Sequence, residues 1–574
     1  MVVGALVVAV SPSSAQAGGN SARGKVSSTS PKRAAKLSVR QRATARPRTV
    51  SKARGTNAFR RSVVRPRVVR PRVVRQPLKG KVVRSTRRGA KRLLTARESE
   101  RFMTKVAKRE ARFFRDGVGY DHATGLTYDG HNIDFHTGEL VGGPRNASAS
   151  SKESLHINVL IKALEGDRTA RLLLSPDAPH KAESVALEVL KNKIKSYERF
   201  NKDYPGYGGF LPWFKVEGGR LQPVSDWRNR VPGLDNGQLA WSLYVAANAL
   251  HDAGHAALAK RYQGHVDLMK DNVVHMFYDP AEKALRAEVR MVAGNKVTPK
   301  KNKYQNNVKG YLLSDPYEGL LLNHFADLFG KWKGNSAAKE SLWATPRRKP
   351  ASYKTKSGEK ITVAEGHWFS SHEDWGYMVL PLRDHALASN LFENGQRART
   401  IHAAEHRNAG LFASVNGVVS GTTSPDYVSN LGIAQIGKLP VTKDKIYSPY
   451  ATFPLALSKD KRLFATWLQH SISQPRMWGP YGMGESFSAK GDKFSPVLTW
   501  DGKVLPLVAY MGGTEASTRK YLTRDGLYKH FLTRDKADYK RFDGKQIHGT
   551  DLAPATPTAD APVSLKPFAK ASAQ

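Results

Sequence analysis

Three acidic side chains stand in segments where helices are expected to begin. They are Asp235 in Pro232-Gly233-Leu234-Asp235-Asn236-Gly237, Glu318 directly after Asp315-Pro316-Tyr317, and Asp374 directly before Trp375-Gly376. Carboxyl groups that share a cleft can donate and accept protons in a reaction. Each acid also fits the spacing of a helix-capping box, with Gln238, Asp315 and Ser371 as the respective partners. Acid–base chemistry and helix capping therefore both stay open at each position.

Aromatic side chains and glycines crowd the same turns. The aromatic residues near the acids are Trp227, Tyr317, Trp368, Trp375, Tyr377, Trp478 and Tyr481, and Trp213 ends a Gly- and Tyr-rich loop. Sugar rings have apolar faces and many hydroxyl groups, so aromatic platforms beside carboxylates suit carbohydrate binding. The competing interpretation is that about half of these rings are ordinary core residues. The combination indicates a site for a polysaccharide.

A fourth acid, Glu485, lies in the segment Met477–Phe487, which contains three glycines and one proline. This composition does not favour a helix, so Glu485 is not expected to cap one. It is either a solvated loop acid or a further member of the site.

Amphipathic segments dominate the region that must position these acids. In Ala182–Phe200, for example, Val185, Val189 and Ile194 recur at helical spacing. The expected helices are 154–165, 182–200, 237–253, 258–277, 316–332, 375–392, 450–458 and 462–471. Long loops rich in Gly, Pro, Trp and Tyr separate them, and loops of this kind within a compact domain are usually functional. The sequence predicts an all-α domain.

Positive charge is concentrated at the start of the chain. The formal net charge is +43, and the first 97 residues hold 26 lysines and arginines but no Asp or Glu. The repeat Val63-Val64-Arg65-Pro66-Arg67 forbids a helix and favours extended chain. All ten tryptophans lie between Trp213 and Trp500, so the core belongs to the later region. We predict a disordered basic arm over 18–97, a catalytic domain over 98–550 and a disordered tail over 551–574.

The first 17 residues resemble a secretory signal. Val2–Val10 is apolar, and Ala15-Gln16-Ala17 matches a signal-peptidase site, although a positive n-region is missing. We therefore expect a secreted or periplasmic protein. The basic arm is then either an electrostatic tether to an anionic envelope polymer or a solvated spacer, rather than a specific nucleic-acid binder.

One motif suggests a metal site. His402-Ala403-Ala404-Glu405-His406 matches the inverted zinc-protease signature. Isolated five-residue matches arise by chance in long chains, and Gly410 ends the expected helix about one turn later. The chain also contains no cysteine, which excludes thiolate ligands and disulfides. We expect no metal or cofactor, and a monomer.

Six segments in one order resemble the glucoamylase-like glycoside hydrolase group, which includes β-1,2-glucanases and the C-terminal domain of cyclic β-1,2-glucan synthases. They are Gly209–Phe214, Val231–Leu239, Ser314–Leu320, Asp374–Pro381, Tyr447–Thr452 and Trp478–Phe487. The chain departs from the group by inserting Asp315-Pro316-Tyr317 before Glu318, and Leu411–Asn416 barely matches the group's corresponding segment.

The resemblance implies an (α/α)6 toroid in which the loops entering the inner helices line a cleft. It also implies inverting hydrolysis of a β-glucan by one carboxylic acid and one carboxylate, with a β-1,2-linked glucan as the expected substrate. The group's Ser-Glu motif makes Glu318 the acid, with Glu485 as the alternative. Asp235 is the expected base, because a helix N-terminus favours the ionised form. The expected sugar-binding residues are Trp213, Tyr317, Asp374, Trp375, Trp478 and Tyr481.

Two other functions remain open at this stage. A polysaccharide lyase on the same toroid would suit the positive charge of the region after the arm, together with its many Tyr and His residues. A non-catalytic envelope protein that binds an anionic polymer would suit the arm.

Overall fold

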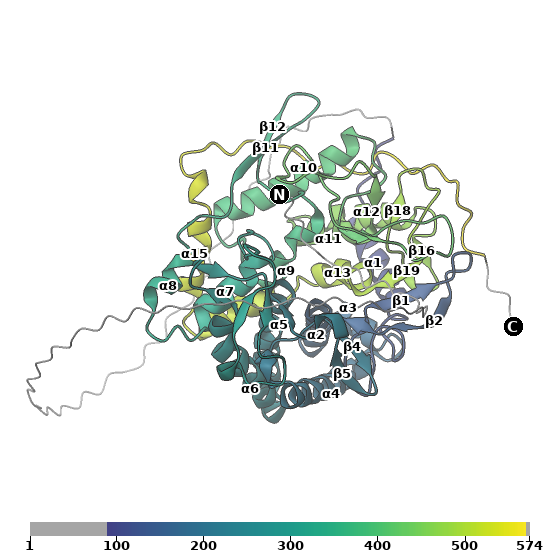
Figure 1. The fold of residues 1–574 in the computed structure, drawn as a ribbon. Coiled ribbons are helices and arrows are strands. Elements are labelled where there is room, and N and C mark those ends of the chain that lie inside the picture. Colours follow the sequence, from purple (N-terminus) through teal and green to yellow (C-terminus); the bar gives the residue numbers. More distant parts are fainter. Residues whose placement is uncertain (1–88, 570–574) are drawn as a thin grey trace, which may run out of the picture. The chain divides into compact units, whose positions relative to one another are not determined.

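The computed structural model describes residues 89–569, and its α-helices lie within 96–538 (Figure 1). The signal-like segment 1–17 and most of the basic arm 18–97 lie outside the described residues. The helices are α1 Ala96–Glu110, α2 Ser150–Leu164, α3 Arg168–Leu174, α4 Ala182–Asp203, α5 Gly233–Asp252, α6 Ala256–Phe277, α7 Gly319–Phe329, α8 Ser336–Ser341, α9 Gly376–Val379, α10 Ala386–Glu405, α11 Phe453–Leu457, α12 Lys461–Ile472, α13 Trp500–Tyr510, α14 Glu515–Arg524 and α15 Tyr528–Asp538.

The strands are short and form small antiparallel sheets in the loops between helices. Three sheets have three strands each: β19 Val497–Thr499 with β1 Gly130–Ile133 and β2 Leu140–Arg145; β10 Tyr304–Asn306 with β9 Glu288–Met291 and β6 Arg230–Pro232; and β3 Ala147–Ser148 with β4 Phe214–Glu217 and β5 Arg220–Pro223. The pairs are β11 Pro350–Lys354 with β12 Lys360–Ala364, β13 Val415–Asn416 with β14 Tyr427–Val428, β15 Ile446–Tyr447 with β18 Phe487–Ser488, β16 Trp478–Gly479 with β17 Gly482–Met483, and β7 Tyr278–Asp279 with β8 Ala284–Leu285.

The helices form an inner set and an outer set, as expected for an (α/α)6 toroid. Helix α5 packs against α2, α7 and α9, while α13 packs against α2 and α11, and the 3-10 turn Ser371–Asp374 before α9 contacts α11. The inner helices α2, α5, α7 and α13 are buried around most of their circumference. The outer helices α1, α4 and α6 each keep one exposed face, the usual pattern of a helix between core and solvent. The fold class predicted from the sequence is confirmed.

The expected helix over 375–392 is wrong, because the chain breaks at Pro381. Helix α9 ends at Val379, and α10 begins only at Ala386 and continues to Glu405. Proline has no backbone N–H and disfavours a helical conformation of the preceding residue. The sequence patterns also missed α13, which contains Gly502 and Pro506.

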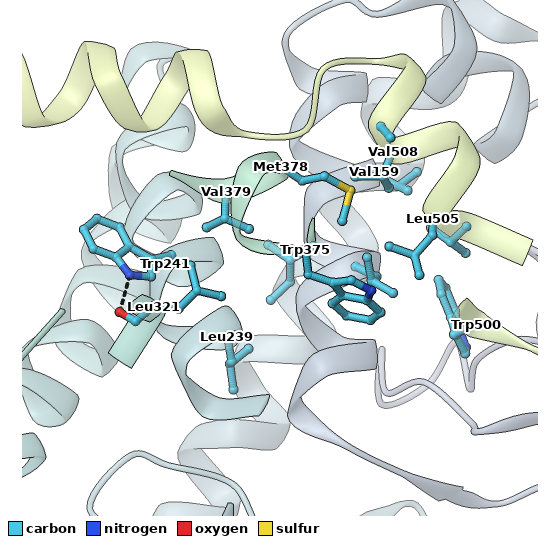
Figure 2. Packing of buried hydrophobic residues seen from close by; sticks show 14 of the residues in the cluster. Val159, Leu239, Trp241, Leu321, Trp375, Met378, Val379, Trp500, Leu505 and Val508 are labelled. Atoms are coloured by element: carbon cyan, nitrogen blue, oxygen red, sulfur yellow. Dashed lines mark hydrogen bonds between the residues drawn. The ribbon is translucent and has the colours of Figure 1, made fainter. Parts of the chain in front are cut away.

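Large apolar side chains from the inner helices meet in the centre of the domain. Figure 2 shows Trp375 between Met378 and Leu505, with Trp500 nearby. Trp241 is fully buried and donates its indole N–H to the carbonyl of Leu321 at 2.8 Å. This apolar centre fixes the spacing between α2, α5, α7 and α13, whose starts carry the site described below. Within residues 89–569, no helix combines the length and apolar character that a membrane span requires.

The C-terminal segment 551–569 is ordered along the described domain, so the prediction of a disordered tail is wrong for these residues. Ala555 accepts a hydrogen bond from the indole of Trp467, and Leu565 donates its backbone N–H to Gly491. Phe568 packs edge-on against Phe494 with ring centroids 5.7 Å apart. The segment has no helix or strand of its own, and its order comes from these tertiary contacts.

Replacement of Phe568 tests this attachment. We expect Phe568→Ala to lower the free energy of unfolding by about 2 kcal/mol, since it removes a half-buried ring from an aromatic cluster. Val563→Ala is the control, because Val563 is 78% exposed and its loss should change stability by less than about 0.5 kcal/mol. Denaturant unfolding measures both, and equal stabilities of the two variants would contradict the packed arrangement.

Candidate active site

The first turns of four inner helices bring ionisable side chains to one place. Lys152 lies in the first turn of α2, Asp235 in that of α5 and Asp501 in that of α13, while Glu318 is the residue that starts α7. All four are partly exposed, in contrast to the buried residues around them. The pKa of each of these side chains is affected by the charge of at least one of the others, so the four form one charged cluster.

Glu318 is the member of the cluster most strongly driven toward its protonated form. Burial, followed by the negative charges of Asp235, Asp315 and Asp501, raises the pKa of Glu318 well above its ordinary value. Its side chain makes no capping hydrogen bond to α7. The cap is instead Asp315, whose Oδ1 accepts the backbone N–H groups of Tyr317 and Gly319 at 3.0 and 3.1 Å. The inserted Asp315 therefore frees Glu318 from the capping role.

Asp235 lies at the start of α5 as predicted, but it does not cap the helix either. Burial raises the pKa of Asp235, and hydrogen bonds from Ser151 and Trp213 together with the charge of Lys152 partly oppose that rise. Trp213, one of the expected sugar-binding residues, therefore contacts this carboxyl group. Its ring also packs against Trp227 at a centroid distance of 4.3 Å.

Asp501 is a site residue that the sequence analysis missed. Burial raises its pKa, with Asp129 adding to the rise and Lys152 opposing it. Its Oδ1 is buried and accepts no hydrogen bond from any residue in 89–569. A sequence signal was present, since Thr499 caps α13 by accepting the N–H of Gly502 and so marks Asp501 as another helix-start acid. Pro506 and Gly502 hid that helix from the pattern of apolar residues.

Lys152 is the cation of the cluster. Its Nζ lies 3.2 Å from Asp129 and 3.9 Å from Asp501. Burial disfavours the ammonium group, but the charges of Asp501, Asp129 and Asp235 outweigh it and raise the pKa of Lys152. Lys152 therefore stays charged and offsets part of the repulsion among the acids.

Glu485 is buried, with 2% of its surface exposed. Its Oε1 accepts the backbone N–H and the side-chain amide of Asn416, both at 3.1 Å, and its Oε2 accepts the hydroxyl of Thr499 at 2.6 Å. Burial raises the pKa of Glu485, while these hydrogen bonds oppose the rise. Both oxygens are occupied, and through Thr499 the carboxyl group holds the start of α13, which carries Asp501.

Two tyrosines complete the surroundings of the acids, and neither was predicted. Tyr427 in β14 is partly exposed, and burial followed by the charges of Asp501, Glu485 and Glu318 raises its pKa well above the ordinary value. Tyr450 donates its hydroxyl to the carbonyl of Ser414, which lies in the segment 411–416 where the family pattern was weakest. No sequence motif marked Tyr427, because its strand β14 is only two residues long and lies between irregular segments.

Three predicted sugar-binding residues are buried and engaged with protein groups. Asp374 accepts from Arg399 at 2.6 Å and from Gln396 at 3.2 Å. Tyr317 donates its hydroxyl to the carbonyl of Glu365, and Trp375 lies in the apolar centre of Figure 2. The capping box near Asp374 is shifted by one residue from the expected pair, since Ser370 and Glu373 form it.

Trp478 and Tyr481 lie on the hairpin formed by β16 and β17, and both are partly exposed. The guanidinium of Arg109 in α1 is 5.9 Å from the ring of Trp478. Burial and the charge of Glu139 raise the pKa of the Tyr481 hydroxyl, and the charges of Arg112 and Arg115, directly after α1, oppose that rise. The structure thus groups these two rings with α1 and not with the acids named above.

The zinc-protease motif does not form a metal site in the described domain. His402 and His406 stack with ring centroids 4.1 Å apart, and Glu405 accepts hydrogen bonds from Tyr353 and the backbone of Lys356. Within residues 89–569, no group of three or more His, Asp or Glu side chains is arranged around one point as metal ligands would be. The two histidines and the glutamate therefore serve the packing of α10.

An (α/α)6 toroid with carboxyl groups at the inner helix starts defines the class of glycoside hydrolases of the glucoamylase-like group. A sequence profile of the endo-β-1,2-glucanase SGL family, GH162, matches residues 126–572, and the chain belongs to this family. Among proteins with curated descriptions, none matches this chain.

The chain resembles solved structures of endo-β-1,2-glucanases. The endo-β-1,2-glucanase from Talaromyces funiculosus with sophorose is 32% identical, has a TM-score of 0.78, and the match covers 82% of this chain and 96% of that one. A glutamate-to-glutamine mutant of that enzyme with β-1,2-glucan is also 32% identical, with a TM-score of 0.79. The match covers 83% of this chain and 97% of that one. The endo-β-1,2-glucanase from Chitinophaga pinensis is 15% identical with a TM-score of 0.50, covering 77% and 97% of the two chains, and shares the fold.

Substitution of Glu485 separates a positioning role from an acid role. We expect Glu485→Gln to keep activity within about tenfold of the wild type, because an amide can accept from Asn416 and donate to Thr499, whereas loss of a catalytic acid costs about 10²–10⁴-fold. Glu485→Ala should lower the free energy of unfolding by about 2–4 kcal/mol, since it leaves buried donors unpaired. Glucan hydrolysis and denaturant unfolding measure the two effects. A loss of 10²-fold or more in the glutamine variant would assign Glu485 to the chemistry.

Proposed function

We propose that this glycoside hydrolase cleaves β-1,2-glucan within the chain and inverts the anomeric configuration. The observation that carries the proposal is the cluster at the inner helix starts, where Glu318 is driven toward its acid form beside the carboxyl groups of Asp235 and Asp501. The linkage is supported by the family match and by the T. funiculosus structures with sophorose and β-1,2-glucan.

In this mechanism Glu318 protonates the oxygen of the leaving glucosyl group. A carboxylate accepts a proton from water as that water attacks the anomeric carbon, and the bond to the leaving oxygen breaks. A general acid must hold its proton near the working pH, and burial among negative charges gives Glu318 that property. The helix start alone would favour the ionised form, but burial and the neighbouring carboxylates outweigh it.

Asp501 is the base that the geometry favours over Asp235. The carboxyl group of Asp235 already receives hydrogen bonds from Ser151 and Trp213. Asp501 keeps a buried oxygen without a hydrogen bond from residues 89–569, which leaves a lone pair for a water molecule. Asp235 then binds and orients the sugar together with Trp213, in line with the aromatic platform expected from the sequence.

Export is a further part of the proposal and rests on the signal-like sequence at residues 1–17. The basic arm would then hold the enzyme near an anionic polymer of the cell envelope, with the catalytic domain acting as a monomer on glucan in the same compartment.

Glutamine and asparagine variants test the assignment of acid and base. On β-1,2-glucan we expect Glu318→Gln and Asp501→Asn to lower kcat by about 10²–10⁴-fold with little change in KM, since each removes a proton transfer but keeps the shape of the side chain. Asp235→Asn should raise KM and lower kcat less. A greater loss of kcat in Asp235→Asn than in Asp501→Asn would exchange the two roles.

The products test the reaction itself. Reducing ends should appear from β-1,2-glucan and not from β-1,3- or β-1,4-glucan, with oligosaccharides as early products and the α-anomer formed first, as proton NMR can detect. A product with an unsaturated end that absorbs ultraviolet light would show that the protein is a lyase instead. Binding without cleavage of any glucan would favour the non-catalytic alternative.

Replacement of Lys152 should shift the pH profile. The positive charge of Lys152 stabilises the ionised forms of Asp501 and Asp235 and therefore lowers their pKa values from those that burial alone would set. In Lys152→Met the base would protonate at higher pH, so the acidic limb of kcat/KM should move upward by about one pH unit or more. Lys152→Arg should restore most of the wild-type limb. An unchanged acidic limb in Lys152→Met would show that this lysine has only a structural role.

A further inference from the structure

One face of the outer helix α1 carries a row of positive side chains. Arg101, Lys105, Lys108, Arg109 and Arg112 line a shallow surface hollow together with Thr104. They recur at the three- and four-residue spacing that places side chains on one side of a helix. The opposite side of α1 buries Met103, Val106 and Ala107 against the core. The row is therefore held on a fixed helix of the domain.

The five cations of the row have no ion-pair partner among the described residues. Residues 1–88 contain no Asp or Glu. The acids of α1 are committed to other partners: Glu98 pairs with Arg92, Glu100 with Arg168, and Glu110 is buried with Lys503. Uncompensated cations on one face attract anionic groups at a matching spacing.

The hairpin of β16 and β17 borders this row and adds an aromatic ring. The carbonyl of Pro480 accepts hydrogen bonds from Arg109 at 3.4 Å and from Arg112 at 3.1 Å, which fixes both guanidinium groups beside the hairpin. Trp478 on the same hairpin is partly exposed, with Arg109 5.9 Å from its ring. A ring beside cations can hold a sugar face while the cations bind its acidic substituents.

This chemistry fits an acidic polysaccharide better than a lipid bilayer. The large hydrophobic side chains exposed in the described domain are Val141, Val292, Val308 and Val563, and none belongs to α1 or to the hairpin. A helix that lies on a membrane presents apolar residues that enter the lipid beside its basic face, and here those residues face the core.

We propose that Arg101, Lys105, Lys108, Arg109 and Arg112, with Trp478, form a surface site for a polysaccharide that carries carboxylate or phosphate groups. The site is separate from the carboxyl cluster that performs hydrolysis and does not depend on the linkage that the enzyme cleaves. It would hold the domain on an acidic polymer through α1 itself, in addition to any contribution from the basic arm.

Charge substitution in the full-length chain tests the site. The site variant carries Arg101→Gln, Lys105→Gln and Lys108→Gln. The matched control carries Lys191→Gln, Lys195→Gln and Lys202→Gln, which remove the same charge from exposed positions of α4. Both variants keep the basic arm, so its contribution to polymer binding is the same in the two proteins. Binding to polygalacturonate is measured by calorimetry at 0.15 M salt.

We expect the site variant to bind polygalacturonate about tenfold more weakly than the wild type and the control to stay within about twofold, because exposed charge contacts contribute modestly and additively. Hydrolysis of neutral β-1,2-glucan should be unchanged in both variants, which separates loss of this site from loss of the catalytic function. Equal binding by the site variant and the control would overturn the proposal.

A second measurement uses the wild-type protein and so does not depend on how the variants fold. Polygalacturonate should slow acetylation of Lys105 and Lys108 but not of Lys191, as read by mass spectrometry. Equal protection of all three lysines would contradict a defined site. Stronger protection of Lys105 and Lys108 by duplex DNA or by anionic vesicles at equal charge would replace the polysaccharide with that partner.

Discussion

The direction of the inner helices is the constraint on which the site depends. Helices α2, α5, α7 and α13 begin at the same place, so their N-terminal partial positive charges of about half an elementary charge each lie near one another. That arrangement attracts carboxyl groups, but several of them in a partly buried space also repel. Lys152 relieves part of this repulsion, and a proton on Glu318 relieves more. The crowding of carboxyl groups therefore favours the protonated form of Glu318 beside its ionised neighbours.

Buried carboxyl groups behind the site fix the loops between helices by accepting hydrogen bonds from them. Glu485 joins Asn416 of β13 to Thr499 at the start of α13. Glu373 does the same for another loop, since it accepts the backbone N–H groups of His367, Trp368 and Ser370, and burial raises its pKa to about 7. Irregular segments lack regular backbone partners, so side-chain acceptors must satisfy their N–H groups.

A buried ion pair links the outer helix α1 to the inner helix α13. Glu110 of α1 and Lys503 of α13 form a fully buried ion pair at 2.6 Å, and Glu110 also accepts the N–H of Met483 in β17. This pair ties the outer helix that bears the positive row to the inner helix that bears Asp501. Breaking one partner of such a buried pair leaves an uncompensated charge, so the two helices are strongly joined.

The sequence by itself determined the helical class, most outer-helix boundaries and the presence of acids at helix starts, because helical periodicity and capping residues are local signals. It identified Glu318, Asp235 and Trp213 as neighbours only through the family resemblance. The tertiary structure decided which acids share space: it added Asp501, Lys152 and Tyr427 to the cluster and placed Asp374 and Trp375 in buried contacts. Burial and charge coupling depend on residues far apart in the chain, so no local pattern in the sequence predicts them. For the same reason the sequence did not predict the order of the segment 551–569, which depends on tertiary contacts.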